Sequence, residues 1–473
     1  MTISKFARLG AAAASALALC VSLGLVPLGL SAGAVHAESL NDAIAMAYAQ
    51  NPTLVRGRAA QRSNDETYVQ ARSQLGPNLS ASLSSTYNDL PNLAGSRSTT
   101  AAGLSASQTI FASGGISSQI DAAKSGVLSG QQSLRSTESS VLLDVISVYT
   151  AVRRDQQALQ ISQDNYDILK QQLDQTQAQF DAGQLTRTDV AQSQARLSAS
   201  AAALATAQAQ LDTDRASYVA IVGQAPVALD PETALPGLPS DFNAALDAAQ
   251  KNNPDLQAAQ YAADAAKSRV RAERSVFGPT VALQASSGGQ EQGIGIGKIA
   301  DNDATSATVR VSIPLFTAGL NSSRVRQSIE DYNAQLAVVE QSRRQVTSSV
   351  AQAWSQMLAA RSAVVSNQEQ VRAAQVAADG VKVEQQVGLR TNIEVLNAQQ
   401  ELKSAQLQLI EAQRNEYVAG SQLLSVMGGL TAKAFVPNIE VYDPEKNFDA
   451  VKSKGWTPLE PVVRGLDGLV AGH

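Results

Sequence analysis

An unbroken heptad pattern between Gly114 and Asp181 constrains this chain more than any other feature. Apolar side chains recur there every seven residues with no proline between them, at Val145, Val152, Leu159, Tyr166, Leu173 and Phe180, and a second set follows an interleaved seam at Val127, Leu134, Val141 and Val148. This spacing is typical of a supercoiled helix. At 1.5 Å per residue such a helix would be about 100 Å long, which is more than a compact globular domain can bury.

A second long helix is predicted to return antiparallel to the first. Gly183 allows the left-handed conformation that ends a helix, and Thr186 followed by Asp189 forms a capping box that starts the next one. The heptad spacing resumes at Val190, Leu197, Leu204, Leu211 and Tyr218. We therefore expect a long helix over about 114–182 and a return helix over about 187–223.

The same unit is written twice in the sequence. Adding 205 to Gly183, Thr186, Asp189 and Val190 gives Gly388, Thr391, Glu394 and Val395, and Asn-Pro and Gly-Pro pairs recur upstream at an offset of 202. The pattern predicts one structural repeat over 38–229, a linker over 230–240 and a second repeat over 241–429. The second repeat should hold a long helix over about 318–387 and a return helix over about 392–428. Residues 430–473 are rich in proline, and we interpret them as an extension that is partly disordered.

Each repeat also holds two segments whose apolar and polar residues alternate. They are predicted to form strands at about 78–88, 102–111, 280–290 and 305–316. Their length suits a tilted strand that crosses a bilayer, and Phe111, Phe277 and Phe316 stand beside the ends of strands, where interfacial aromatic residues would lie. Ordinary hairpins with one buried face remain the alternative, because soluble antiparallel sheets alternate in the same way.

Four strands are too few to close a barrel. An open sheet edge is not tolerated in lipid, because its backbone groups find no water to bond. If these strands enter a membrane, several chains must therefore combine them, with polar residues facing a wet lumen and apolar residues facing lipid. This argument predicts an oligomer without fixing the number of chains.

The first 37 residues have the features of a secretory signal peptide: Lys5 and Arg8, an apolar run over 9–30, and small residues up to Ala37. A transmembrane anchor is the alternative reading. Without this segment the chain has no cysteine, its only histidine is the terminal His473, and its net charge is 35 minus 42, or −7. Cysteine or histidine nucleophiles and zinc clusters are excluded, and a nucleic-acid surface is disfavoured. We predict no enzyme activity, no cofactor and no metal site.

In these repeated motifs the chain resembles the TolC-type outer-membrane efflux and secretion channels. The resemblance covers residues 38–430 and rests on Gly-x-x-Thr-x-x-Asp/Glu-Val at Gly183 and Gly388, the paired Asn-Pro and Gly-Pro motifs, and Phe-x-x-Gly at Phe111 and Phe316. It implies an α+β membrane protein that forms a homotrimer in the outer membrane of a Gram-negative bacterium. Its twelve strands would form one shared 12-stranded barrel that continues into an α-helical tunnel across the periplasm. It also implies two partners, a periplasmic adaptor (membrane fusion) protein and an inner-membrane transporter.

The resemblance assigns roles to individual residues. Gly183, Thr186, Gly388 and Thr391 would lie at the periplasmic tip and engage the adaptor. Asp189 and Arg390 would hold the tip shut, and Glu394 would belong to an acidic ring that constricts the pore. Some relatives carry a second carboxylate where this chain has Asn397, and an aromatic residue where it has Gln385, so the closed tip should be held less tightly here.

The function we expect is a passive exit duct for small toxic compounds in a tripartite export system. An outer-membrane component of type I protein secretion has the same fold and is the alternative. A soluble periplasmic coiled-coil protein is a more remote one.

Overall fold

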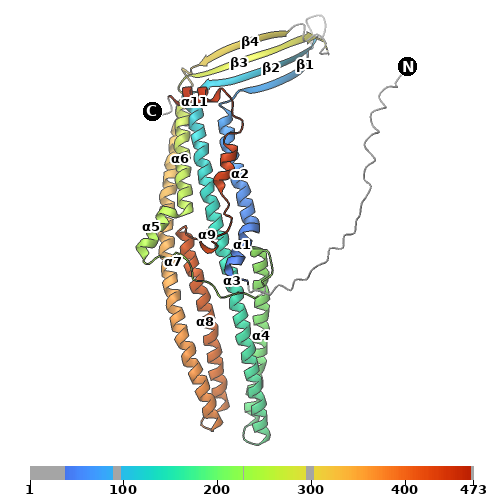
Figure 1. Cartoon of the computed structure of the whole chain (residues 1–473), viewed down its shortest axis with the longest axis vertical. Helices are drawn as coiled ribbons and strands as arrows, with labels where there is room; N and C mark the ends of the chain where they lie inside the picture. Colours follow the sequence, from blue (N-terminus) through green and yellow to red (C-terminus); the bar gives the residue numbers. More distant parts are fainter. Residues whose placement is uncertain (1–37, 89–96, 227, 294–302, 470–473) are drawn as a thin grey trace, which may run out of the picture. The chain divides into compact units, whose positions relative to one another are not determined.

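The computed structural model describes residues 38–88, 97–226, 228–293 and 303–469 (Figure 1). The predicted signal peptide and His473 lie outside these ranges. The described residues from Glu38 onward belong to one structural unit. Its β-sheet lies at one end of the long helices, and the turns between the long helices lie at the other end (Figure 1).

The duplication is visible in the lengths of the helices. Each helix of the first half has a partner of nearly equal length in the second half: α1 (Leu40–Gln50) and α5 (Phe242–Asn252) have 11 residues each, α2 (Pro52–Ser73) and α6 (Pro254–Ser275) have 22, α3 (Gly115–Asp181) and α7 (Leu320–Gln386) have 67, and α4 (Arg187–Val222) and α8 (Asn392–Val426) have 36 and 35. The two halves of the chain therefore contain the same succession of helices, as the repeat in the sequence predicts.

The duplicated Asn-Pro motifs join the start of one helix to the end of another. Asn51 accepts a hydrogen bond from the backbone N–H of Thr53 at the start of α2, and its side-chain amide donates to the carbonyl of Ile221 near the end of α4 at 2.9 Å. Asn253 does the same at the start of α6, where its amide donates to the carbonyl of Val426, 2.8 Å away at the end of α8. Both asparagines therefore satisfy groups that a helix end leaves unpaired.

The main apolar core lies around the middle of α3. Leu142, Ile146 and Tyr149 are completely buried there, against Ile44 of α1 and Tyr218 of α4. The Tyr149 hydroxyl donates to backbone carbonyls of Glu38 and Asp230, at 2.9 and 2.8 Å. A buried tyrosine is thereby satisfied in an otherwise apolar core, and it fixes the entry and exit segments of the first repeat.

Below this core the heptad prediction is wrong about which seam is buried. Tyr166 and Leu173 are half-buried and Phe180 is exposed, whereas the buried residues are Ser162, Asn165, Leu169, Gln172 and Thr176. The buried residues follow one another at three and four residues, so they form a single stripe that lies next to the predicted one, on the side of α3 where α4 and α8 pack. Most of the side chains on this lower buried face are polar.

The sheet is antiparallel, with the order β1-β2-β3-β4. Its strands are β1 (Asn78–Asn88), β2 (Arg97–Phe111), β3 (Thr280–Gln292) and β4 (Asp303–Ser312). β2 starts five residues before the predicted 102, since Arg97 pairs with Asn88. β4 ends before the predicted 316, because Pro314 has no N–H to donate to a neighbouring strand.

The register gives the sheet two different faces. Leu83, Leu104 and Val309 share one face with Ala and Val neighbours, because Ala81 pairs with Leu104, Ala106 with Ala285, and Leu283 with Val309. The other face carries hydroxyl groups and Arg310, and hydrogen bonds join Ser80 to Ser105 and Ser286 to Ser306 across it. The apolar side chains on the first face are largely exposed, so nothing within the described residues covers them.

The C-terminal extension forms three short helices, α9 (Ala432–Phe435), α10 (Pro444–Val451) and α11 (Glu460–Gly468), in the part that the structure describes. The partial disorder expected of this extension stays a prediction. Arg72 of α2 holds this segment through a double ion pair with Glu460, at 2.6 and 2.8 Å, and through a hydrogen bond to the carbonyl of Lys452. Residues 470–473 lie outside the described ranges.

Within the described part of the chain, no helix is long and apolar enough to cross a bilayer.

Candidate functional site

The turn between α3 and α4 is built from a helix end and a helix start. Gly183 adopts a positive φ of 75°, and its N–H donates to the carbonyl of Phe180, which ends α3. The Asp189 carboxylate accepts from the Thr186 N–H at 3.0 Å and from the Thr186 hydroxyl at 2.7 Å. These contacts form the capping box that the sequence predicts, and they use one carboxylate oxygen of Asp189 to start α4.

The turn between α7 and α8 repeats this geometry and adds charge. Gly388 has a φ of 80°, and Glu394 accepts from the N–H and the hydroxyl of Thr391, both at 2.8 Å. Arg390 lies between two carboxylates, 2.8 Å from Glu384 and 2.8 Å from Glu394. The hydrogen bond from the Thr391 backbone, followed by the contact with Arg390, lowers the pKa of Glu394 to about 2. Glu394 is therefore ionised at any physiological pH.

Asp189 and Arg390 are not brought together within one chain. Asp189 is engaged in the first turn, and Arg390 is engaged by Glu384 and Glu394 in the second. Asn397, which is predicted to lie near the constriction, accepts a hydrogen bond from Arg196 of α4 at 3.0 Å. This bond links α4 to α8 directly.

A ring of buried hydrogen bonds joins the two hairpins close to these turns. Gln172 donates to Asn392 at 2.9 Å, Asn392 donates to Ser193 at 2.9 Å, and Ser193 donates to Thr176 at 3.3 Å. Thr176 closes the ring by donating to the backbone carbonyl of Gln172 at 2.7 Å. All four residues are buried, and they come from α3, α4 and α8. We call them the hairpin-bridging ring.

No motif or spacing in the sequence directly predicts this ring. Ser, Thr, Asn and Gln are frequent on both faces of the long helices, so their spacing does not distinguish the buried ones. The only sequence signal for the ring is a spacing: Gln172 follows Leu169 by three residues, and Thr176 follows Gln172 by four. This spacing places the three side chains on one face of the helix.

Farther from the turns, Arg154 joins the same three helices through charge. It contacts Asp155 of its own helix at 2.6 Å, Asp214 of α4 at 3.2 Å and Glu411 of α8 at 3.1 Å. Burial, together with a hydrogen bond to Asp214, raises the pKa of Asp155 to about 6. The Arg154 guanidinium therefore forms ion pairs with three carboxylates where α3, α4 and α8 pack together.

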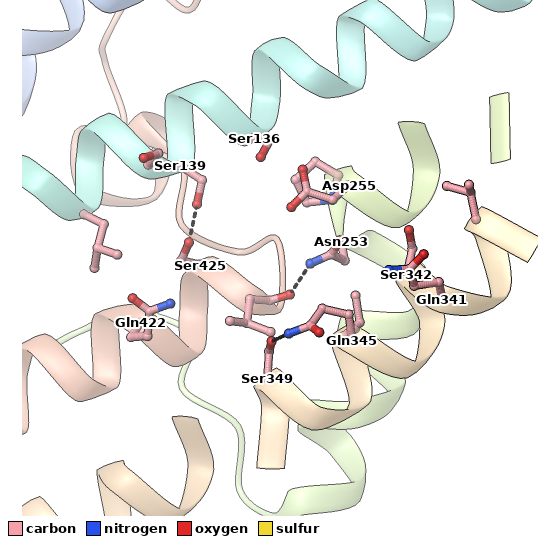
Figure 2. A pocket seen from close by; sticks show the side chains of 16 residues that line it. Ser136, Ser139, Asn253, Asp255, Gln341, Ser342, Gln345, Ser349, Gln422 and Ser425 are labelled. Atoms are coloured by element: carbon pink, nitrogen blue, oxygen red, sulfur yellow. Dashed lines mark hydrogen bonds between the residues drawn. The ribbon is translucent and has the colours of Figure 1, made fainter. Parts of the chain in front are cut away.

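A cavity of about 510 Å³ opens between α3, α6, α7 and α8 (Figure 2). Its polar lining consists of serine, glutamine and asparagine side chains together with Asp255, and a hydrogen bond of 2.9 Å joins Ser139 of α3 to Ser425 of α8 across it. Such a lining suits water and polar solutes. No group of His, Cys, Asp and Glu side chains that could hold a metal ion occurs in the residues that the structure describes.

The three predicted interface aromatics lie where strands and helices meet. Phe111 ends β2 and is half-buried, whereas Phe277 and Phe316 are exposed. Phe277 follows α6, and Phe316 lies between β4 and α7.

The comparisons with known proteins agree with this architecture. The profile of the family described as "Outer membrane efflux protein" matches residues 43–224 and 245–429, one segment for each repeat. The chain belongs to this outer membrane efflux protein family. It is 33% identical over 430 residues to the outer membrane efflux protein BepC of Brucella suis, a match that covers 91% of this chain and 94% of BepC.

Other members of the efflux protein family are less similar in sequence. The outer membrane protein TolC of Escherichia coli is 26% identical, and the match covers 94% of this chain and 95% of TolC. The alkaline protease secretion protein AprF of Pseudomonas aeruginosa is 25% identical and matches 64% of each chain. The crystal structure of the outer membrane protein VceC from Vibrio cholerae shares the fold, with a TM-score of 0.71, 20% identity, and coverage of 82% of this chain and 96% of VceC.

Family membership and fold together confirm several predictions. The chain is an outer-membrane efflux protein of the TolC type, with a duplicated helical half and a four-stranded sheet. Among its matched relatives, BepC is named as an efflux protein and AprF as a secretion protein.

Proposed function

We propose that this chain forms the outer-membrane exit duct of a tripartite export system, in which three copies share one barrel and one helical tunnel. The two-faced sheet carries the proposal. Within the described residues β1 pairs only with β2 and β4 only with β3, so both edges are open while one broad face is apolar. A sheet of this kind is stable in lipid only if further copies complete it.

A second surface supports association of the helices. Leu358, Val365, Val376 and Val383 of α7 are exposed, although they follow one another at 7, 11 and 7 residues and so share one side of the helix. An exposed apolar stripe along a long helix is expected where another helix packs. We assign this stripe to contact with a neighbouring copy in the trimer.

The turns are the proposed docking points for a periplasmic adaptor protein. Gly183, Thr186, Gly388 and Thr391 are accessible there, and Leu389 is 76% exposed at the second turn. We propose that Arg390 restrains the tip through Glu384 and Glu394, and that Asp189 meets Arg390 of a neighbouring copy when the tip is closed. Three copies of Glu394 and Asn397 would surround the narrow entrance, where a ring of carboxylates favours cations.

Small molecules are the proposed cargo, driven by an inner-membrane transporter. BepC, named as an efflux protein, matches almost the whole chain, and this match supports efflux. The similarity to AprF, named for protease secretion, supports polypeptide export as the second candidate. We propose no catalytic step, no cofactor and no nucleic-acid partner, because the polar groups described above serve caps, ion pairs and helix contacts.

Reconstitution and cross-linking test this proposal. We expect purified protein to migrate as a heat-modifiable trimer and to give ion conductance in planar bilayers. A photoreactive group at Thr186 or Thr391 should capture an adaptor protein in cells. A matched group at Ser198, on the exposed side of α4 and away from the turn, should not. A monodisperse monomer without conductance would overturn the proposal. The type of transporter that purifies with the captured adaptor distinguishes efflux from protein secretion.

A further inference from the structure

The exposed side of α11 has the composition of a buried surface. Leu459, Val462, Leu466 and Leu469 are 40 to 74% exposed, and their spacing of three, four and three residues places them on one side of the helix. Trp456, just before the helix, is 56% exposed as well. A helix on a water-facing surface normally shows polar residues there, so this stripe needs a covering partner.

The other side of α11 is fixed firmly to the molecule, so the exposed stripe has a defined orientation. Glu460 pairs with Arg72, and Val463 packs with Leu75 and Ile116. Asp467 is completely buried and accepts backbone N–H groups of Ala112, Gly114 and Ser117 at 2.8 to 3.0 Å. These bonds hold the start of α3, because Ser117 lies in its first turn and Ala112 and Gly114 directly precede the helix, whose N-cap residue Gly114 has no side chain to form a cap.

The position of α11 connects the stripe to the apolar face of the sheet. The helix lies across the place where the strands end and the long helices begin (Figure 1). Ala112 directly follows β2, and Leu75 stands three residues before β1. If the apolar band of the sheet crosses a bilayer, α11 therefore lies at the level of the headgroups on the helical side.

The charges around the stripe also fit a membrane surface. Between Lys452 and Leu469 the exposed charged residues are Lys452, Lys454 and Arg464, and the two acids of this segment, Glu460 and Asp467, are buried. Lys452 pairs with the exposed Asp449 and Arg464 lies 3.8 Å from Glu460, so Lys454 and the outer side of Arg464 supply the positive charge nearest the stripe. Exposed apolar and aromatic side chains flanked by cations suit the interface of an anionic bilayer.

We propose that α11 and Trp456 form an interfacial anchor that lies in the headgroup region of the periplasmic leaflet and binds anionic phospholipid. The inference rests on the proposed insertion of the sheet and adds a lipid contact outside the barrel. A neighbouring copy fits this position less well than lipid. Copies would join at the open edges, β1 and β4, whereas α11 contacts β2, an inner strand.

Tryptophan quenching tests the proposal. The chain contains two tryptophans, so Trp354→Phe leaves Trp456 alone, and Trp456→Phe leaves Trp354 alone as the matched control. Trp354 packs edge-on against Phe242, with ring centroids 6.5 Å apart, far along α7 from the sheet. Both variants would be reconstituted into vesicles of phosphatidylethanolamine and phosphatidylglycerol at a three-to-one ratio, with part of the lipid brominated near the glycerol end of its acyl chains.

We expect the bromolipid to reduce the fluorescence of Trp456 by about half or more and to leave that of Trp354 nearly unchanged. Replacing Val462 and Leu466 by serine should weaken the quenching of Trp456. Conductance measured on the same vesicles shows whether the sheet has inserted. If the protein conducts ions but the fluorescence of Trp456 is not quenched, the sheet has inserted and only the proposed anchor is wrong. Disulfide formation between copies of Val462→Cys would also overturn it, because the stripe would then be a contact between subunits.

Discussion

Replacing Ser193 by alanine should loosen the two hairpins of this channel protein near their turns. Ser193 is 1% exposed and holds two bonds of the hairpin-bridging ring, one from Asn392 of α8 and one to Thr176 of α3. Ser200 offers a matched control. It lies seven residues farther along α4, is also buried, and donates only to the carbonyl of Leu197 within its own helix.

The magnitude follows from the bonds lost. Ser193→Ala removes both bonds and leaves the Asn392 amide without that acceptor in a buried place, which costs about 1–3 kcal/mol per chain. In the proposed trimer the three copies would add to about 3–9 kcal/mol if they act together. Because about 1.4 kcal/mol is a tenfold change in an equilibrium, a closed tip that depends on this ring should open far more often. Ser200→Ala removes a hydrogen bond that lies within α4 and should leave the tip unchanged.

Single-channel recording in planar bilayers measures this effect. We expect Ser193→Ala to increase the mean conductance or the time spent in a high-conductance state, and Asn392→Ala to do the same. Thermal unfolding in detergent, recorded on the same preparations, separates gating from folding. If Ser193→Ala lowers the unfolding temperature yet conducts like Ser200→Ala, the ring stabilises the fold without restraining the tip, and the argument for gating fails.

Four further predictions follow from other contacts. Arg390→Ala, which removes the ion pairs to Glu384 and Glu394, should raise conductance in planar bilayers, and an unchanged closed-state conductance would remove Arg390 from the proposed restraint. Glu394→Gln should weaken cation selectivity, and equal reversal potentials in wild type and variant would contradict the acidic ring. The Asp155 carboxyl lies beside Arg154 and Asp214, and its pKa is raised from 3.8 to about 6 in the folded chain. It therefore binds its proton more tightly when folded and contributes stability that is lost as the pH rises through about 6. Wild type should therefore gain more thermal stability than Asp155→Asn between about pH 7.5 and pH 5, and identical gains would show that Asp155 is not the group responsible. Finally, Asp467→Ala should destabilise the start of α3 by about 3 kcal/mol, measured by chemical denaturation, whereas Asp449→Ala, an exposed acid that pairs with Lys452, should cost less than about 1 kcal/mol. Equal losses would contradict the capping role.

The sequence was sufficient for the parts of the fold that obey a period or a repeated motif. Heptads predicted the long helices to within two residues, and the duplicated Gly and Thr positions predicted both turns. Alternation predicted all four strands, and the register then showed that their apolar residues share one face. In each case the signal is local, because the type of secondary structure is determined by residues that are close together in the chain.

Contacts between distant segments could not be predicted in this way. Arg72 and Glu460 are 388 positions apart, and nothing around either residue indicates the other. The hairpin-bridging ring draws its side chains from three helices, and its polar residues resemble many exposed ones nearby. The predicted buried seam at Tyr166 and Leu173 failed for the same reason, since the partner helices, and not the period alone, decide which face is covered.

The two repeats have the same order of helices and strands, but they differ in side-chain contacts at the turns and at the sheet. These differences bear on function. At the turns, Arg390 is held by Glu384 and Glu394, whereas the equivalent positions of the first repeat carry Leu185, Gln179 and Asp189, which cannot form the same pair of ion contacts. At the sheet, Asp467 accepts from the N–H groups of Gly114 and Ser117 at the start of α3, whereas no side chain within the described residues is seen to accept from the first turn of α7. In a trimer, hairpins of two kinds would therefore alternate around the axis. Charge-changing substitutions at the tip should therefore affect conductance most at the turn between α7 and α8. The lipid contact that we propose at α11 should stabilise the first repeat, because α11 packs against β2 and α3.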